Sequence, residues 1–309
     1  MRILMWHVHG SYTTALVQGA HEYLLPVLPD RGPDGLGRAR TWDWPPSAIE
    51  VTPEQARDED VDVVVLQRRH EEELAARWLG RRPGRDVPAV YLEHTSPEGR
   101  IQDMRHPAAD RPDLTLVHVT HFNSLFWDAG STPTRVIEHG IVDPGYRYSG
   151  RLPRAAVVIN EAGRRGRITG TDLLAKLDVP IDLFGIGAAE LGGIKDLPQA
   201  SLHDAMAERR VYLHPVRWTS LGLALLEAMH LGMPVVALAT TEVVEAVPAE
   251  AGVVSNRLDR VRNAVRHLAR NPNEARERGR AARRAALSRY GLDRFLADWD
   301  ALFAEVVTG

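Results

Sequence analysis

The chain has 309 residues, of which 44% are apolar and 26% charged, and its formal net charge is -3 at pH 7. This composition is typical of a soluble globular protein, and at roughly 100–200 residues per domain the length predicts two domains. The chain contains no cysteine, which excludes disulfides, thiolate metal sites, iron–sulfur clusters and cysteine nucleophiles. Because His7 and His9 interrupt the first apolar run before a signal peptide or membrane span can form, we expect a cytoplasmic protein without an integral membrane segment.

The charge is concentrated near the C-terminus. Between Arg257 and Arg294, twelve arginines oppose four carboxylates, so this segment is basic and the remainder of the chain is acidic. Nucleic acids and anionic membranes bind basic patches, but here no aromatic residues alternate with the arginines, and the many alanines favour a solvated helix surface. We therefore expect no nucleic-acid partner and at most weak peripheral contact with a membrane.

In the first half, apolar runs of strand length alternate with helix-length segments. This alternation predicts an α/β protein with parallel sheets. The expected strands are 2–6, 61–66, 89–92, 114–119 and 134–137, with helices over 13–25 and 71–79. The stretch from Pro26 to Pro53 is rich in Pro, Gly, Asp and Arg, which predicts a long surface loop.

The same alternation starts again after a polar connection at about 143–154. The expected strands there are 156–159, 181–184, 211–213 and 235–238. The expected helices are 171–177, 201–208, 221–231 and 258–289, followed by an amphipathic helix over 292–307.

The window from His214 to Ala237 is a strand, a loop, a short helix and a strand. Gly232 before Met233-Pro234 supplies the stop signal for the helix. At the start of the helix, backbone N–H groups form an anion-binding pole, and Gly222 allows a ligand to approach closely. The residues of this pole are Thr219, Ser220, Leu221, Gly222 and Leu223.

Glu227 lies in the otherwise apolar part of this helix. A carboxylate there needs a charged partner or ligand hydroxyls, unless it lies on the surface beside the apolar face. Both interpretations stand on the sequence alone.

A second polar window follows the expected strand 156–159 and opens a helix at Thr171. It contains three arginines, among them Arg164 and Arg167. They are either solvated side chains of a turn or a phosphate site, in which the helix start and the guanidinium groups act together.

The segments 222–229 and 232–237 resemble the donor-site signature of GT-B glycosyltransferases of family 4, the group 1 type. These are retaining enzymes that use nucleotide-activated sugars. Their motif has two glutamates separated by seven residues. Glu227 occupies the second place, so the resemblance assigns it to the nucleotide ribose, and Thr219 replaces the first glutamate, near the donor sugar.

The resemblance extends to the arginine-rich window. Gly163-Arg164 fits the Gly-Arg pair of the family, Thr169 stands where the family has a lysine, and Arg167 is the expected substitute for that lysine. The resemblance implies that these residues neutralise the donor pyrophosphate. Gly185 resembles the glycine turn that lines the nucleotide pocket, whereas a dehydrogenase fingerprint would need glycine in place of Glu190.

In the first half, Gly10 after His7-Val8-His9 resembles the glycine-bearing first loop of GT-B acceptor domains. A His-x-His pair also opens metal-dependent amidohydrolase barrels, but that fold needs eight strand–helix units and further ligands. His94 matches the histidine that faces the sugar across the cleft in the family. His118 and His121 are further candidates for the acceptor side.

One motif points away from this interpretation. Asp60-Val61-Asp62 spells the Asp-x-Asp of metal-dependent GT-A transferases, but these carboxylates precede a strand instead of following one. No metal is expected.

The resemblance implies a GT-B fold, with two Rossmann-like parallel-sheet domains facing a cleft. The expected domains are 1–148 on the acceptor side and 149–290 on the nucleotide-sugar side, with 291–309 as a helix crossing back to pack on the first domain. The implied activity is that of a metal-independent, hexosyltransferase-like glycosyltransferase. It would use no cofactor, a UDP- or GDP-type donor and a small-molecule or glycan acceptor, and retain the anomeric configuration. The motifs leave the donor sugar and oligomeric state open.

Arg164, Arg167 and His94 are the expected catalytic residues. Because Thr219 and Thr169 depart from the family pattern, a catalytically degenerate nucleotide-sugar-binding or partner protein is an alternative. A GT-B sugar epimerase is another.

Overall fold

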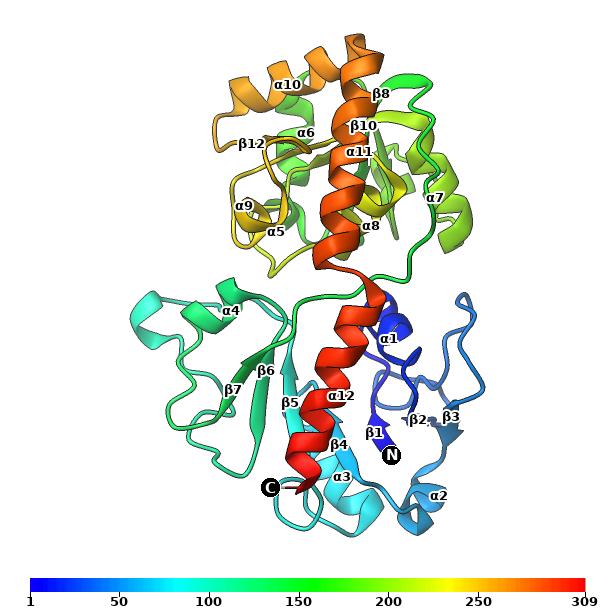
Figure 1. Ribbon diagram of the computed structural model, residues 1–309, viewed down its shortest axis with the longest axis vertical. Coiled ribbons are helices and arrows are strands. Elements are labelled where there is room, and N and C mark those ends of the chain that lie inside the picture. Colours follow the sequence, from blue (N-terminus) through cyan, green and yellow to red (C-terminus); the bar gives the residue numbers. More distant parts are fainter. Residues whose placement is uncertain (309) are drawn as a thin grey trace. The chain divides into compact units, whose positions relative to one another are not determined.

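The computed structural model describes residues 1–308 and divides into two compact units (Figure 1). Unit 1 is Met1–Val142 together with the helix that begins at Leu292, and unit 2 is Asp143–Gly291. The boundary comes six residues earlier than position 148, because Tyr148 is bonded within unit 2. Its N–H donates to the Leu231 carbonyl at 3.1 Å and its hydroxyl to the Arg210 carbonyl at 2.8 Å.

Unit 1 is built on a seven-stranded parallel sheet of order β3-β2-β1-β4-β5-β6-β7. The strands are β1 (Arg2–Met5), β2 (Glu22–Pro26), β3 (Ala48–Val51), β4 (Val63–Leu66), β5 (Ala89–Glu93), β6 (Thr115–His118) and β7 (Thr134–Val136). The strand order reverses between β1 and β4, which lie side by side. In open α/β sheets ligands bind outside the carboxyl ends of the strands at such a switch point.

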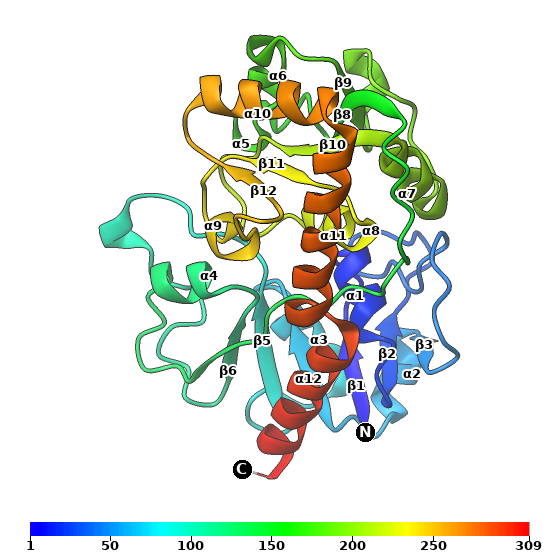
Figure 2. The same ribbon diagram turned by 45° about the horizontal axis from the view of Figure 1, so that its top comes forward.

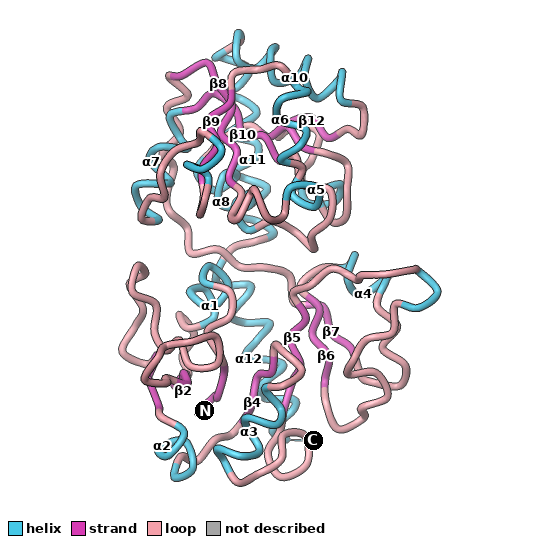
Figure 3. Tube along the Cα trace, turned by 180° about the vertical axis from the view of Figure 1, so that it is seen from behind, coloured by secondary structure: helices cyan, strands magenta, loops and turns pink. Residues whose placement is uncertain are grey.

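Helices cover both faces of this sheet (Figures 1 and 3). They are α1 (Gly10–Leu16), α2 (Pro53–Asp58), α3 (Glu71–Leu79), η1 (Ile101–Asp103), α4 (His121–Phe126) and α12 (Leu292–Thr308). One face packs on α2 and α3 around Trp78. The C-terminal helix α12 contacts α1 and β4 and buries its apolar stripe, which includes Phe295, Trp299 and Phe303. Helix α12 therefore belongs to unit 1.

Unit 2 has a five-stranded parallel sheet of order β12-β11-β10-β8-β9 (Figure 2). The strands are β8 (Leu152–Val158), β9 (Ile181–Phe184), β10 (Arg209–His214), β11 (Val235–Ala237) and β12 (Gly252–Val254). The helices are α5 (Gly166–Thr169), α6 (Thr171–Leu177), η2 (Ala188–Leu191), α7 (Gln199–Glu208), α8 (Leu223–Leu231), α9 (Val243–Ala246), α10 (Leu258–Arg270) and α11 (Pro272–Arg289). Helices α6 and α10 share a core with one face, and α7, α8 and α11 contact β10.

Two expectations about the first 53 residues are wrong. The helix expected over 13–25 ends at Leu16, because Tyr23, Leu24 and Leu25 pair with β1 and β3 as strand β2. Burial between two neighbouring strands overrides local helix preference here. The expected loop between Pro26 and Pro53 contains strand β3, so it is a loop only in part. Strand β12 was also not expected.

Arginines of the basic helices near the C-terminus form hydrogen bonds with other parts of unit 2. Arg262 donates to the Leu177 carbonyl at 2.9 Å, and Arg266 to the Asp178 carbonyl at 2.8 Å, at the end of α6. Guanidinium groups satisfy the last carbonyls of a helix and complement its dipole. These arginines therefore have a structural role within unit 2. Among residues 1–308, no helix is both long and apolar enough to cross a membrane.

Candidate donor and acceptor sites

The candidate donor site lies at the carboxyl end of the unit 2 sheet. The loops after β8, β9 and β10 all start there, since the three strands are parallel neighbours. These loops contain the predicted glycines, arginines and helix start. The fold therefore brings together segments that lie up to about 60 residues apart in the sequence.

The loop after β8 carries the arginines. Arg164 Nε donates to the Glu161 carboxylate at 3.2 Å, and 70% of its side chain is exposed. The Arg164 guanidinium holds the pKa of Glu161 below its usual value. An exposed ion pair of this kind is weakly held, so an added anion can compete for Arg164. The exposed Arg167 side chain makes no hydrogen bond or ion pair within residues 1–308, which leaves it open to an anion.

Thr169, which stands at the place of the family's lysine, is buried at 4% exposure. Its hydroxyl donates to the Arg165 carbonyl at 3.2 Å and lies 3.0 Å from the Thr171 hydroxyl. Both contacts of the Thr169 hydroxyl therefore lie within the α5–α6 turn. Arg167, the expected substitute for the lysine, is exposed.

The arginine loop is fixed to the loop after β10 by Gly170. This residue has φ +75°, and a Cβ added to it would lie 1.9 Å from the Pro215 carbonyl oxygen. Arg217 strengthens the connection, because its Nη2 donates to Asp172 at 2.9 Å and its backbone N–H donates to the Ile168 carbonyl at 2.9 Å. The two loops therefore form one preorganised surface.

The loop after β10 ends at Gly222, which caps helix α8. A Cβ added to Gly222 would lie 2.6 Å from Cε1 of His214, so glycine is needed for close packing. Ser220 and Leu221 bury their side chains, whereas Thr219, Gly222 and Leu223 remain partly exposed. The first N–H groups of a helix have no intrahelical acceptor. The first N–H groups of α8 therefore belong to partly exposed residues and are suited to bind an anion.

The His214 ring packs against Gly222 at the end of this loop. The sequence did not identify His214 as a site residue. It is 2% exposed, and neither ring nitrogen has a hydrogen-bond partner within residues 1–308. Burial lowers its pKa to about 4, so the ring is neutral at pH 7. Its position at the end of β10, directly before Pro215, is the only sequence signal for it.

Glu227 is buried at 5% exposure and faces α7. Its carboxylate accepts a hydrogen bond from Gln199 Nε2 at 3.0 Å, and His203 Nε2 lies 3.4 Å from the same oxygen. The surface interpretation of Glu227 is therefore wrong. The structure supplies the partners that a buried carboxylate requires.

The two remaining predicted glycines of unit 2 differ in whether the surrounding atoms leave room for a side chain. Gly185 has φ +114°, and a Cβ there would lie 2.4 Å from the Ile159 carbonyl oxygen, so a side chain is excluded. Gly163 has no heavy atom within 4 Å of a built Cβ. Only Gly185 is fixed by local geometry.

The carboxyl end of the unit 1 sheet collects aromatic and imidazole rings. His94 follows β5 and lies between His9 and Tyr12, with ring centroids 4.3 Å and 4.5 Å away. Burial, and then the nearby His9 and His139, lower the pKa of His94 well below its usual value. His139 is fully buried, and burial lowers its pKa to about 3. The lowered pKa values leave His94 and His139 uncharged at pH 7 on this ring-lined surface.

Gly10 is the first residue of α1, and a Cβ there would make only ordinary contacts, the nearest with Trp42 Nε1 at 3.6 Å. His118 is completely buried at the end of β6, which lowers its pKa to about 4. It therefore lies below the surface of the sheet edge. His121 is exposed at the start of α4.

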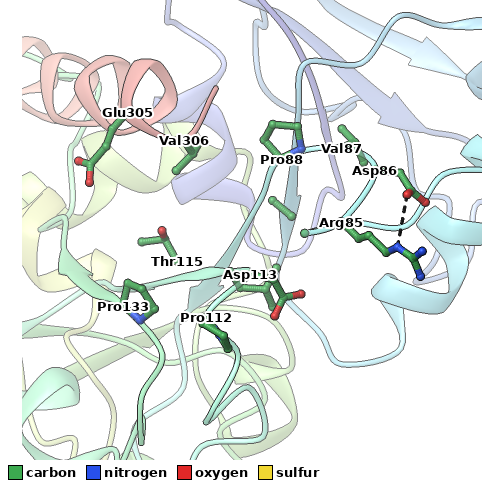
Figure 4. A pocket seen from close by; sticks show the side chains of 13 residues that line it. Arg85, Asp86, Val87, Pro88, Pro112, Asp113, Thr115, Pro133, Glu305 and Val306 are labelled. Carbon is green, nitrogen blue, oxygen red and sulfur yellow. Dashed lines mark ion pairs between the residues drawn. The ribbon is translucent and has the colours of Figure 1, made fainter. Parts of the chain in front are cut away.

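Among residues 1–308, no group of three or more His, Asp or Glu side chains is placed to hold a metal ion. Asp62 of the Asp-x-Asp sequence lies before β4 and accepts a hydrogen bond from the Arg2 backbone N–H at 2.7 Å. A pocket of about 560 Å³ lies at the amino ends of β5 and β6, where Pro88, Thr115 and Glu305 line it (Figure 4). This is the end of the sheet opposite to the His94 surface.

The comparisons with known proteins agree with this arrangement. Residues 188–271 match the family described as Glycosyl transferases group 1. A search of curated proteins finds no significant match.

Several solved structures share the whole fold. Sucrose-phosphate synthase from Thermosynechococcus elongatus is 12% identical with a TM-score of 0.74, covering 100% of this chain and 99% of that one. Anabaena HepE in complex with UDP and glucose is 12% identical with a TM-score of 0.68, covering 99% and 100%. AviGT4, a glycosyltransferase of avilamycin A biosynthesis, is 16% identical with a TM-score of 0.62, covering 100% and 98%.

The chain therefore has the GT-B fold, with two Rossmann-like α/β units, and the predicted fold class is confirmed. The segment of its second unit that matches the group 1 glycosyl transferases runs from the start of η2 to beyond the end of α10 and includes α7, β10 and α8. Together, the matched segment and the fold support the prediction that the chain is a glycosyltransferase. Two open parallel sheets exclude the amidohydrolase barrel.

Proposed function

We propose that the chain transfers a sugar from a nucleoside diphosphate sugar to a hydroxyl-bearing acceptor. The observation that carries this proposal is the shared surface of two loops in unit 2. Gly170 and Arg217 fix the arginine loop against the segment that leads into α8. Cationic side chains and a helix start on one surface are the combination that diphosphates bind.

The predicted arginines, the helix start and Glu227 each have a place in this proposal. Arg164 and Arg167 bind the diphosphate, and the amides of residues 219–223 bind beside them. Glu227 accepts hydrogen bonds from the ribose hydroxyls, with Gln199 and His203 holding its carboxylate. HepE was solved with UDP and glucose, which favours a UDP-type donor here, with GDP as the alternative.

The reaction breaks the bond between the anomeric carbon and the phosphate oxygen and forms a bond from that carbon to the acceptor oxygen. Negative charge grows on the departing phosphate, where fixed cations and amides lower the barrier. The acceptor proton passes to that phosphate oxygen, so no protein base is required. This is the course of a reaction that retains the anomeric configuration.

A second candidate function is binding without transfer. Thr169 is buried and bonded to the Arg165 carbonyl, so it does not replace the lysine of the family. If Arg167 does not supply the missing charge either, the diphosphate binds without activation.

Thermal-shift measurements with UDP, GDP and ADP, followed by donor-turnover assays with the nucleotide that stabilises the protein, test the proposal. Stabilisation by UDP or GDP together with donor turnover supports it. Stabilisation without turnover across a panel of donors and acceptors favours the binding protein. A changed sugar without any acceptor identifies an epimerase instead.

A further inference from the structure

The segment between β2 and β3, residues 27–47, is held against helix α1 by Trp44. The Trp44 side chain is buried at 3% exposure, and its Nε1 donates to the hydroxyl of Thr14 in α1 at 2.8 Å. Arg38 holds the same part of the segment, because its Nη2 donates to the Trp44 carbonyl at 2.6 Å. Trp42, two residues before Trp44, therefore lies on a fixed part of unit 1.

His7 follows β1 and packs on the same segment, with its ring centroid 4.8 Å from that of Trp44. Burial lowers the pKa of His7 below its usual value, so the ring is neutral at pH 7 and carries one proton. Nδ1 lies 3.0 Å from the Gly37 carbonyl oxygen. A carbonyl oxygen only accepts hydrogen bonds, so the proton lies on Nδ1. The other ring nitrogen, Nε2, therefore keeps a lone pair.

Trp42 and His7 approach the same point beside Gly10. A Cβ built on Gly10 would lie 3.6 Å from Nε1 of Trp42 and 4.0 Å from Nε2 of His7. Apart from the adjacent residues and the α1 backbone, no other heavy atom of residues 1–308 lies within 4 Å of that point. Both side chains are partly exposed, and neither nitrogen makes a hydrogen bond within the described part of the chain. A hydrogen-bond donor and an acceptor therefore flank one open point on unit 1.

A hydroxyl group suits this pair of atoms, because it both donates and accepts hydrogen bonds, whereas a carboxylate only accepts and an ammonium group only donates. We infer that Trp42 and His7 form a subsite of unit 1 for a neutral sugar as the acceptor substrate. Hydroxyls of that sugar accept from Nε1 of Trp42 and donate to Nε2 of His7. This inference rests on the proposed function, since transfer needs an acceptor hydroxyl, and it narrows the acceptor to a neutral polyhydroxyl compound. Every protein atom of the subsite belongs to unit 1.

Nitrogen-15 NMR of the full chain at pH 7, without nucleotide, measures the two contacts directly. The probes are the methyl α-glycosides of glucose, galactose and mannose. We expect at least one of them to shift both the Trp42 indole N–H signal and the His7 Nε2 signal. The indole N–H of Trp127 is an internal control, because it donates to the Thr95 carbonyl at 3.1 Å and should not shift. If none of the three glycosides shifts both signals, the inference is overturned.

Two variants separate sugar binding from folding. Trp42→Phe keeps an aromatic ring but removes the N–H donor, and Gly10→Ala places a methyl group between the two nitrogens without overlap and without a positive φ. We expect each to weaken glycoside binding by about 3- to 10-fold, the scale of one neutral hydrogen bond. The matched control is Gly166→Ala, which adds a methyl group to the first residue of α5 with no atom within 4 Å and should bind the glycoside like wild type. Wild-type affinity in folded Trp42→Phe or Gly10→Ala would refute the subsite.

A glucoside with all its hydroxyls methylated tests the hydroxyl contact itself. It has no hydrogen to donate to Nε2 of His7 and should leave that signal unchanged, and an equal shift with this compound would refute the contact. The proposed function fails in a different way. If the glycosides shift both signals but no nucleotide sugar binds, the proposed function is wrong and the sugar contact stands. If sugar transfer occurs with the same acceptor KM in wild type, Trp42→Phe and Gly10→Ala, the proposed function stands and the subsite is wrong.

Discussion

The substitution Gly170→Ala should disrupt the candidate donor surface more than any other single methyl group added to its loops. At φ +75° an alanine is strained, and its Cβ would lie 1.9 Å from the Pro215 carbonyl oxygen. The backbone strain costs about 1–2 kcal/mol, and forcing the two loops apart costs about 1–3 kcal/mol more, as in overpacked cores. We therefore expect a loss of about 2–5 kcal/mol in the free energy of unfolding.

Three other glycines separate the two contributions. Gly187 has φ +77° and no atom within 4 Å of a built Cβ, so Gly187→Ala measures backbone strain alone. Gly222 does not have a positive φ, but its Cβ would lie 2.6 Å from His214, so Gly222→Ala measures the contact alone. Gly163 has neither feature, and Gly163→Ala should leave stability unchanged or raise it by up to about 1 kcal/mol.

Urea unfolding of the four alanine variants, measured beside wild type, gives the order of destabilisation. Gly170→Ala should be the least stable and Gly163→Ala the most stable. Donor turnover by folded Gly170→Ala should fall by about 100-fold, because the two loops would be displaced by about 1 Å. If Gly170→Ala is as stable and active as Gly163→Ala, the two loops are not fixed against each other. They would then not form the preorganised donor surface.

Three further predictions concern single side chains. Arg164→Ala should lower donor turnover by about 100-fold, as expected for the loss of one fixed donor to the departing phosphate; unchanged steady-state turnover in the folded variant would remove Arg164 from this role. Glu227→Ala should weaken UDP or GDP binding and narrow the preference for the ribonucleotide over its 2′-deoxy form, and calorimetry that finds equal affinities would refute the ribose contact. His214 has its pKa lowered to about 4 in the folded chain, so the unfolded chain binds the extra proton first, and stability falls as the pH drops from about 6.5 to about 4. His214→Phe should therefore flatten the dependence of the unfolding free energy on pH by about 1.4 kcal/mol per pH unit, and an unchanged slope in urea titrations would contradict the buried neutral ring.

Much of unit 2 was predictable because its strands and helices alternate with clear turn signals. Helix α6 and strand β9 have the predicted bounds. The sequence also indicated that Gly222 lies at a helix start beside the end of a strand. It could not indicate that Gly222 packs on His214, because that contact depends on how the loop folds back over β10.

In unit 1 the local signals were misleading or absent. The segment from Glu22 to Pro26 has a short run of consecutive apolar residues, which does not by itself distinguish a helix from a strand, and it forms β2 because β1 and β3 lie on either side of it. Gln67 gave no signal, since a single polar residue after a buried strand is common. The contacts of Gln67 with the Trp6 carbonyl and with His94 Nε2 depend on the spatial order of β1, β4 and β5.

The central claim is that unit 2 binds the nucleoside diphosphate sugar on the surface formed by the loops after β8 and β10. Amide hydrogen exchange of the full chain, measured with and without saturating UDP-glucose or GDP-mannose, tests it most directly. We predict protection of residues 160–170 and 215–223 by one of the two ligands. Binding that protects neither segment, or that protects only segments elsewhere in the chain, would contradict the claim.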